Sequence, residues 1–325
     1  MIKLLKKITA LRNIYFLICR ILNYFRIFKL HSEINALYKF IYVLIHDVEE
    51  SRLLPDYTIA QFDKQWSELP SGRFLLSDPW FRENVHKIIS EYELLIKPEW
   101  FSSKKVLDAG CGNGRWSYGF SKLGCDLTCV DMSYTALQNT SDAVEHFGNK
   151  KKFIRTSLED LDKHVKRGSF DLVFCWGVLH HCRSFMKSLD NLVKCTKNGG
   201  ILYLYLYGRD SLPYEMDLEL FKKRIIYNFV YDDKQKYNFL LKKAHGDKSR
   251  VHNVHDIYAP IINRRFSFSE IKKLLIERGF VDIERTIDHT ELFIKAIKGS
   301  DKYHHKLSFL SSPSKPYWWE LNKKK

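Results

Sequence analysis

The feature that most constrains the fold is a short apolar run that ends in an acid and continues into alternating glycines, Val106-Leu107-Asp108-Ala109-Gly110-Cys111-Gly112-Asn113-Gly114. The apolar residues are typical of the end of a buried strand, and residues 115–123 are typical of the helix that follows a turn. Glycines at alternate positions allow positive φ, and a ligand can approach their main chain because no Cβ intervenes. The sequence therefore predicts a ligand-binding turn between a strand and a helix.

The residues around this turn narrow the class of ligand. A dinucleotide fingerprint needs glycine at 115, where this chain has Arg115, and the Gly-Lys-Ser/Thr of a phosphate-binding loop is absent. Asp108 beside the loop would repel a pyrophosphate but attracts positive charge. Asp131 ends the next predicted strand, 21 residues beyond Gly110, where a carboxylate accepts hydrogen bonds from ribose hydroxyls. Together the two acids predict a cationic nucleoside as the ligand.

Four motifs in chain order resemble those of the class I S-adenosylmethionine-dependent methyltransferases. They are VLDAGCGNGRWS, CDLTCVDMS, FDLVFCWGVLHHC and TKNGGILYLYLY, and the segment FSFSEIKKLLIERGFVDIE looks like the last helix and sixth strand of the family. The resemblance covers residues 104–207 and returns at 266–297. It implies an α/β fold, a Rossmann-like and mostly parallel sheet of seven strands with helices on both faces. It also implies S-adenosyl-L-methionine as the methyl donor.

The resemblance assigns the cofactor to residues near the ends of the first four strands. The assigned residues are Asp108, Gly110, Gly112, Asn113, Gly114, Asp131, Met132, Leu158, Glu159 and Trp176. The chain departs from the family at Ser157, where the family usually has an acid. Recognition of the adenine amino group is therefore expected to pass to Glu159 or to the backbone.

The loop after the fourth predicted strand supplies the candidate catalytic residues. Ligands of open α/β sheets bind outside the carboxyl ends of the strands, so we expect Asp108, Asp131 and His181 to converge there. His181 is the first candidate for a general base and His180 the second, because imidazole titrates near neutral pH. The alternative is that the two histidines only shape the pocket.

Composition indicates the compartment and the partners. The content of 45% hydrophobic and 28% charged residues is typical of a globular protein. The net charge of +15 favours an anionic partner, which can be nucleic acid, a lipid surface or an acidic substrate. The seven cysteines contain no C-x-x-C pair, which is typical of reduced intracellular thiols. We expect a cytoplasmic protein, and no metal site is predicted because spaced ligands are missing.

The segments outside the motifs organise the rest of the chain. We expect an N-terminal helical extension at 1–100, the cofactor-binding core at 101–208, a helical substrate lid at 209–263, the end of the core at 264–298 and a basic aromatic tail at 299–325. Residues 1–30 alternate basic and apolar side chains, with no run long enough to span a membrane. This segment is either a helix in an anionic membrane interface on the cytoplasmic side, or a helix packed on the core. The tail is either a docked aromatic hook or a disordered end.

Three functions compete on this evidence of motifs and charge. The first is methyl transfer to an oxygen or nitrogen of a small-molecule, glycan or lipid-linked acceptor. The second is methylation of tRNA or rRNA, which the positive charge favours, although the Asn/Asp-Pro-Pro-Tyr motif of amino-directed base methylases is missing. The third is a non-catalytic, membrane-associated binding protein on the same fold, which the intact glycines and Asp131 disfavour.

Overall fold

The computed structural model describes residues 14, 34–39, 41–42, 55–299 and 318 of the chain. The membrane-interface segment predicted over 1–30 lies outside the described residues except for Ile14, and so does the predicted tail except for Gly299 and Trp318. Peripheral membrane attachment and cytoplasmic location therefore stay predictions.

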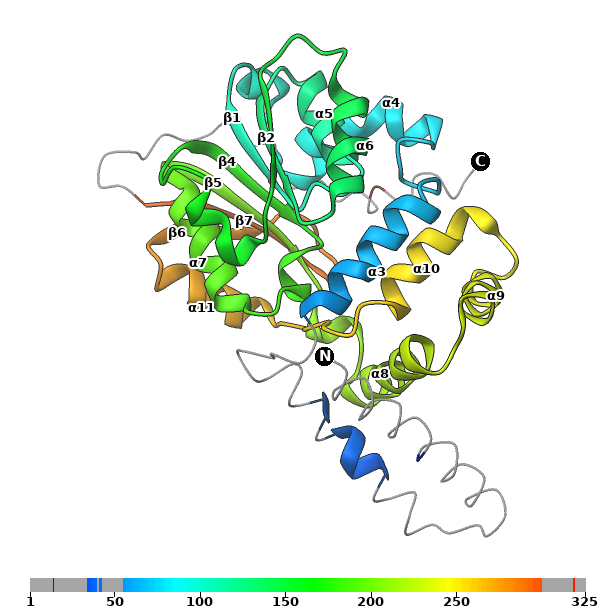
Figure 1. Cartoon of the computed structure of the whole chain (residues 1–325). Coiled ribbons are helices and arrows are strands. Elements are labelled where there is room, and N and C mark those ends of the chain that lie inside the picture. The colour runs from blue at the N-terminus through cyan, green and yellow to red at the C-terminus, as the bar shows by residue number, and fades with distance from the viewer. Residues whose placement is uncertain (1–13, 15–33, 40, 43–54, 300–317, 319–325) are drawn as a thin grey trace.

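One seven-stranded sheet forms the centre of the described chain, in the order β3-β2-β1-β4-β5-β7-β6 (Figure 1). The strands are β1 (Lys105–Ala109), β2 (Asp126–Asp131), β3 (Lys151–Arg155), β4 (Phe170–Trp176), β5 (Thr196–Leu206), β6 (Phe280–Arg285) and β7 (Leu292–Lys298). The first five strands pair in parallel, whereas β7 runs antiparallel to both β5 and β6. The predicted seven-stranded, mostly parallel sheet is confirmed.

Helices cover both faces of this sheet, as Figure 1 shows. They are α3 (Pro55–Glu68), α4 (Pro79–Ile88), α5 (Arg115–Lys122), α6 (Tyr134–Val144), α7 (Phe185–Cys195), α8 (Tyr214–Phe229), α9 (Asp233–Lys243), α10 (Val251–Tyr258) and α11 (Phe268–Ile276). The helices α4, α5 and α6 lie on one face, and α7 and α11 lie on the other. The helices α8, α9 and α10 form the insertion between β5 and α11 that the sequence predicted as helical.

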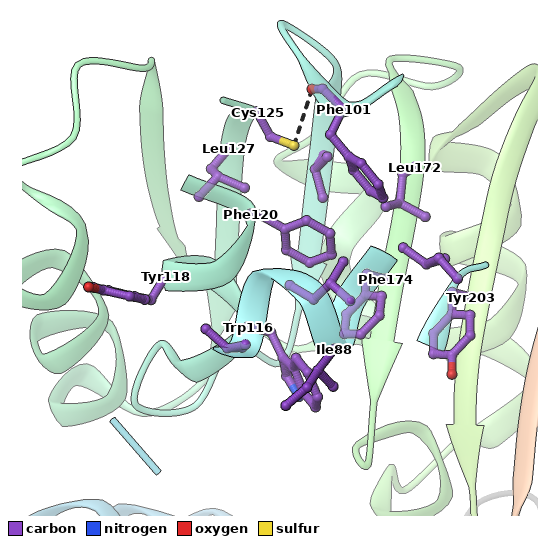
Figure 2. Close-up of a cluster of buried hydrophobic side chains, with 14 of the residues drawn as sticks. Ile88, Phe101, Trp116, Tyr118, Phe120, Cys125, Leu127, Leu172, Phe174 and Tyr203 are labelled. Atoms are coloured by element: carbon purple, nitrogen blue, oxygen red, sulfur yellow. Dashed lines mark hydrogen bonds between the residues drawn. The ribbon is translucent and has the colours of Figure 1, made fainter. Parts of the chain in front are cut away.

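The core is divided by the sheet into two apolar clusters. The cluster under α4 and α5 is rich in aromatic side chains, and Figure 2 shows Trp116, Phe120 and Phe174 packed together within it. The stacked rings of Phe174 and Tyr203 lie 4.9 Å apart between centroids. The cluster under α7 and α11 is largely aliphatic. Burial of apolar area on both faces explains why β1, β4 and β5 read as near-continuous apolar runs.

Two predicted boundaries differ from the structure. The residue types of Asn198-Gly199-Gly200 predict a turn before the fifth strand, whereas β5 already begins at Thr196 and these residues lie where its pairing with β4 shifts register between Phe170 and Leu172. The sequence pattern over residues 81–97 predicts one helix, but the α-helix ends at Ile88 and continues as a π-helical turn over Ile89–Glu93. The register shift depends on pairing with a strand distant in the sequence, which local patterns do not report.

The π-helical turn directs a carboxylate into the aromatic cluster. Glu93 is fully buried and accepts hydrogen bonds from Trp318 Nε1 at 2.6 Å, from Trp176 Nε1 at 3.3 Å and from the Tyr203 hydroxyl. Trp318 is 1% exposed and packs edge-on against Phe74. Burial raises the pKa of Glu93 to about 7, while these three hydrogen bonds oppose the rise. At Trp318, therefore, the predicted tail is docked on the core.

No helix among the described residues has the length and apolar character that crossing a bilayer would require.

Gly208, two residues after β5, offers a test of the close packing against the loop between β6 and β7. A Cβ on Gly208 would lie 1.8 Å from the Thr290 carbonyl oxygen. We expect Gly208→Ala to lower the free energy of unfolding by about 1 to 3 kcal/mol, measured by urea denaturation, because the backbones must separate. Gly148→Ala, where a Cβ meets nothing within 4 Å, is the matched control and should stay within about 0.5 kcal/mol. Equal stability of both variants would contradict this packing.

Candidate functional site

The glycine loop joins β1 to α5 at the carboxyl edge of the sheet. Gly110, Gly112 and Gly114 all have positive φ, at 87°, 54° and 84°. A Cβ on Gly110 would lie 2.3 Å from Val178, and one on Gly114 would lie 2.8 Å from the Thr140 Cα. The loop therefore packs so tightly against the loop after β4 and against the middle of α6 that side chains are excluded at Gly110 and Gly114.

The carboxylate of Asp131 links this loop to the end of β2. Its Oδ2 accepts the Gly112 N–H at 3.0 Å, and its Oδ1 accepts the Ser133 N–H at 2.9 Å. Burial raises the pKa of Asp131, and the backbone hydrogen bonds oppose this rise. Each carboxylate oxygen has a further lone pair, so the group can accept two more hydrogen bonds. This acceptor capacity fits a vicinal diol such as that of ribose.

Asp108 lies deeper than Asp131. It is 1% exposed and accepts the Ser117 hydroxyl at 2.6 Å. Burial raises the pKa of Asp108 to about 7; the Ser117 hydrogen bond opposes the rise, and the charge of Asp131 adds to it. Through this hydrogen bond Asp108 is joined to α5, and its contact with the cofactor stays a prediction.

Helix α3 lies across the glycine loop and brings aromatic side chains to it. The indole of Trp66 lies 2.8 Å from the position that a Cβ of Gly112 would take, and Phe62 lies 5.5 Å from His181 between ring centroids. The Ser133 hydroxyl donates to Asp63 of the same helix. The indole ring of Trp66 thus packs against the main chain of Gly112. The loop therefore fits a planar ligand group, and in this structure Trp66 lies on that face.

Three further residues predicted to bind the cofactor, Met132, Leu158 and Glu159, differ in exposure and in their contacts. Met132 is 37% exposed, and Leu158 is 5% exposed. Glu159 pairs with Arg183 at 3.0 Å and accepts the Ser184 N–H at 2.8 Å, so it links two loops of the protein. Its role toward adenine stays a prediction, as do those of Met132 and Leu158.

Asn113 and Trp176 contact other parts of the chain. The side chain of Asn113 is 9% exposed, and its Oδ1 has no hydrogen-bond partner among the described residues. Trp176 stacks on Tyr205 with 4.1 Å between ring centroids, and the Arg115 guanidinium lies 4.4 Å from its ring. Trp176 therefore borders the aromatic cluster, and its contact with the cofactor stays a prediction.

The two candidate catalytic histidines are buried in the loop after β4. His181 Nδ1 lies 2.7 Å from the Ile262 carbonyl oxygen, which only accepts, so Nδ1 carries the proton and Nε2 keeps a lone pair. Burial lowers the pKa of His181 to about 3, and nearby arginines lower it further, against the opposing hydrogen bond to Ile262. Burial likewise lowers the pKa of His180, whose ring stacks 4.1 Å from Tyr207. Both rings are therefore neutral at pH 7.

A polar network that sequence reasoning missed joins α3 to α10. Gln65 Nε2 donates to Asp256 Oδ1 at 2.7 Å and lies 3.0 Å from His252 Nε2. His252 Nδ1 in turn lies 2.6 Å from the Leu69 carbonyl oxygen, and its ring lies 5.0 Å from that of Trp66. Figure 1 shows the two helices side by side below the sheet edge. Only the pattern of polar residues on both helices could have signalled this contact, since the partners are 187 to 191 residues apart.

Comparison with known proteins places the glycine loop and β4 in one family model. Residues 107–204 match the model described as methyltransferase domain. A ubiquinone biosynthesis O-methyltransferase of Rickettsia conorii is 22% identical over 193 residues, which are 59% of this chain and 61% of that protein. A tRNA U34 carboxymethyltransferase of Campylobacter concisus is 26% identical over 197 residues, which are 58% of this chain and 60% of that protein. Both matches thus span less than two thirds of the relative's length.

Among solved structures, a magnesium protoporphyrin IX methyltransferase of Synechocystis with bound S-adenosylhomocysteine resembles the chain. It is 17% identical with a TM-score of 0.44, and the match covers 75% of this chain and 98% of that one.

The neutral state of His181 can be measured directly. We expect its ring resonances, assigned with His181→Gln, to stay constant between about pH 5 and about pH 8. Because its folded pKa lies below the unfolded value, the unfolded state binds more protons, and stability should fall as pH drops below about 6.5. His181→Gln should reduce this loss, whereas His146→Asn, at an exposed position, should not. A His181 titration near pH 6.5 would contradict the buried geometry.

Proposed function

We propose that this chain, whose residues 107–204 match a methyltransferase-domain model, transfers a methyl group from S-adenosyl-L-methionine to an oxygen or nitrogen of a small-molecule acceptor. The family model that matches residues 107–204 and the O-methyltransferase relatives support this proposal. The observation that carries the proposal is the carboxylate of Asp131, which the Gly112 N–H holds beside the glycine loop, where residues 110, 112 and 114 have no side chain of their own.

Cofactor binding is assigned to groups that the fold already holds in place. The carboxylate of Asp131 is fixed by two backbone N–H groups, so it can accept the ribose hydroxyls without reorganising. The face of Gly112 accepts a flat group once Trp66 shifts aside or packs against it. Asp108, with its raised pKa, becomes ionised next to a cation, so binding of a sulfonium favours its charged form.

The chemistry of transfer depends on orientation more than on a strong base. When bound, S-adenosyl-L-methionine supplies an activated methyl group. The protein has to hold the acceptor atom in line with that methyl group, and such orientation supplies most of the rate gain. His181 Nε2 accepts a hydrogen bond from an acceptor O–H or N–H, but its lowered pKa makes it a weak proton acceptor. His180 and His181 are therefore assigned mainly to positioning, and an acceptor that is already ionised suits them.

The cofactor assignment is tested by exchanging the carboxylate of Asp131 for an amide. We expect Asp131→Asn to weaken binding of S-adenosylhomocysteine by about tenfold or more in calorimetry, because charge-assisted hydrogen bonds to ribose are lost. Asp126→Asn, at the opposite end of the same strand, is the control and should change affinity by no more than about twofold. An unchanged affinity in Asp131→Asn would remove the ribose assignment.

A second candidate is methyl transfer to RNA, which the net charge of +15 and the tRNA-modifying relative favour. The two candidates are separated by labelled-methyl transfer to a total cell extract, divided by ultrafiltration into RNA and small molecules. We expect the label in the small-molecule fraction. Label that stays with the RNA fraction and is released by ribonuclease would favour the second candidate, and no label in either fraction would refute both.

A further inference from the structure

Arg224 of α8 is a buried cation whose hydrogen bonds are incomplete. The side chain is 1% exposed and faces inward from the insertion. Its Nε donates to the Ile257 carbonyl oxygen at 2.9 Å, but its Nη1 has no hydrogen-bond partner among the described residues. A guanidinium offers five N–H donors, and burying such a charge is costly unless it is paired and hydrogen-bonded. Arg224 therefore keeps donor capacity that the described residues do not use.

The acid nearest to Arg224 compensates it only in part. The Asp217 Oδ1 lies 3.6 Å from Arg224 Nη1 and 3.5 Å from Arg265 Nε, beyond ordinary hydrogen-bond length, and has no hydrogen-bond partner itself within the described part of the chain. Its Oδ2 accepts the Tyr42 hydroxyl at 2.6 Å. One carboxylate is thus shared between two guanidinium groups. Arg265 has a second carboxylate, Glu291, at 3.7 Å.

These groups adjoin the two histidines assigned to the acceptor side. The Arg265 guanidinium lies 5.3 Å from the ring of Tyr207, on which His180 stacks. Neither ring nitrogen of His180 has a hydrogen-bond partner in the described residues, although the ring is fully buried. A row of buried polar atoms without hydrogen bonds therefore extends from α8 to the loop after β4. These atoms belong to Arg224, Asp217, Arg265 and His180.

The surrounding charge favours an anion at this place. Arg264 also lies here, donating through Nη2 to the Arg183 carbonyl oxygen at 2.9 Å and through Nη1 to that of Cys182. Three arginines thus lie near the histidines, and Arg224 and Arg265 pair with the two carboxylates of Asp217 and Glu291. A further acid, Asp256, lies toward α3 and accepts a hydrogen bond from Gln65. The arginines also contribute to the lowered pKa of both histidines, as expected where the potential is positive.

We propose that Arg224 binds an acidic group, a carboxylate or a phosphate, carried by the methyl acceptor. The inference rests on the proposed methyl transfer and names its substrate class. The planar fork of arginine matches both acids through paired hydrogen bonds. Asp217 then acts as a positioning residue that holds Arg224 toward the acceptor. Since α8 belongs to the insertion, specificity resides in the segment added to the sheet.

The charge of the methyl acceptor is tested with two pools of metabolites, one acidic and one neutral. An ultrafiltered metabolite extract of the source organism is divided by anion exchange at about pH 8, where carboxylates and phosphates are retained and most phenols are not. Each pool is incubated with the full chain and methyl-labelled S-adenosylmethionine. We expect the label in products from the acidic pool. Label only from the neutral pool overturns the proposal while leaving the proposed function intact, and label from neither pool refutes both.

Variants show whether Arg224 is responsible. We expect Arg224→Gln to lower the initial rate of methyl transfer to the acidic pool by about 10- to 100-fold. Its affinity for S-adenosylhomocysteine should equal that of the original protein. Lys223→Gln removes the same charge from an exposed neighbouring position and should leave transfer unchanged. Should Arg224→Gln not fold, Arg224→Lys decides, because it keeps the charge but loses the fork. Transfer by the folded variant equal to that of the original protein shows that Arg224 only compensates Asp217, and overturns the proposal.

Discussion

The carboxylate of Asp131 is the interaction on which the rest of the site depends. It accepts one backbone N–H from the loop after β1 and one from the loop after β2, so the two loops cannot move independently. The tight contacts of Gly110 with Val178 and of Gly114 with Thr140 add the loop after β4 and the middle of α6 to the same unit. These contacts fix the carboxyl edge of the sheet before any ligand binds. The helices α3, α8 and α10 then need only to complete a site whose floor is rigid.

The sheet could be predicted from the sequence because its signals are local. Each parallel strand is buried on both faces and reads as an apolar run, and the glycines and Asp131 lie at fixed positions relative to those runs. The cap at Ser133, which accepts the Ala136 N–H at 3.0 Å, was also visible in the sequence. Asn198-Gly199-Gly200, whose residue types favour a turn, lies within the bounds of β5 at the register shift, where no β4 partner is paired with it and Gly199 has φ 73°.

The parts that could not be predicted depend on residues far apart in the chain. Gln65 donates a hydrogen bond to Asp256, which lies 191 positions later in the chain. The surroundings of Arg224 likewise form only when the insertion packs against the residues after β5. The histidines show the same limitation, because their position was predicted but their environment was not. Burial and nearby arginines lower their pKa values, which leaves both candidate bases neutral near pH 7. Roles that depend on electrostatics therefore need the whole fold.

The docking of Trp318 on Glu93 sets an order for biosynthesis. The two residues are 225 positions apart, so a ribosome that has completed the sheet strands up to β7 has not yet delivered the indole. Until then the Glu93 carboxyl group lacks one of its donors, and Phe74, Phe81 and Trp116 lack a ring that packs between them. Domains generally fold as units during synthesis. In this chain the aromatic half of the core is therefore completed only after translation has passed β7 and reached Trp318.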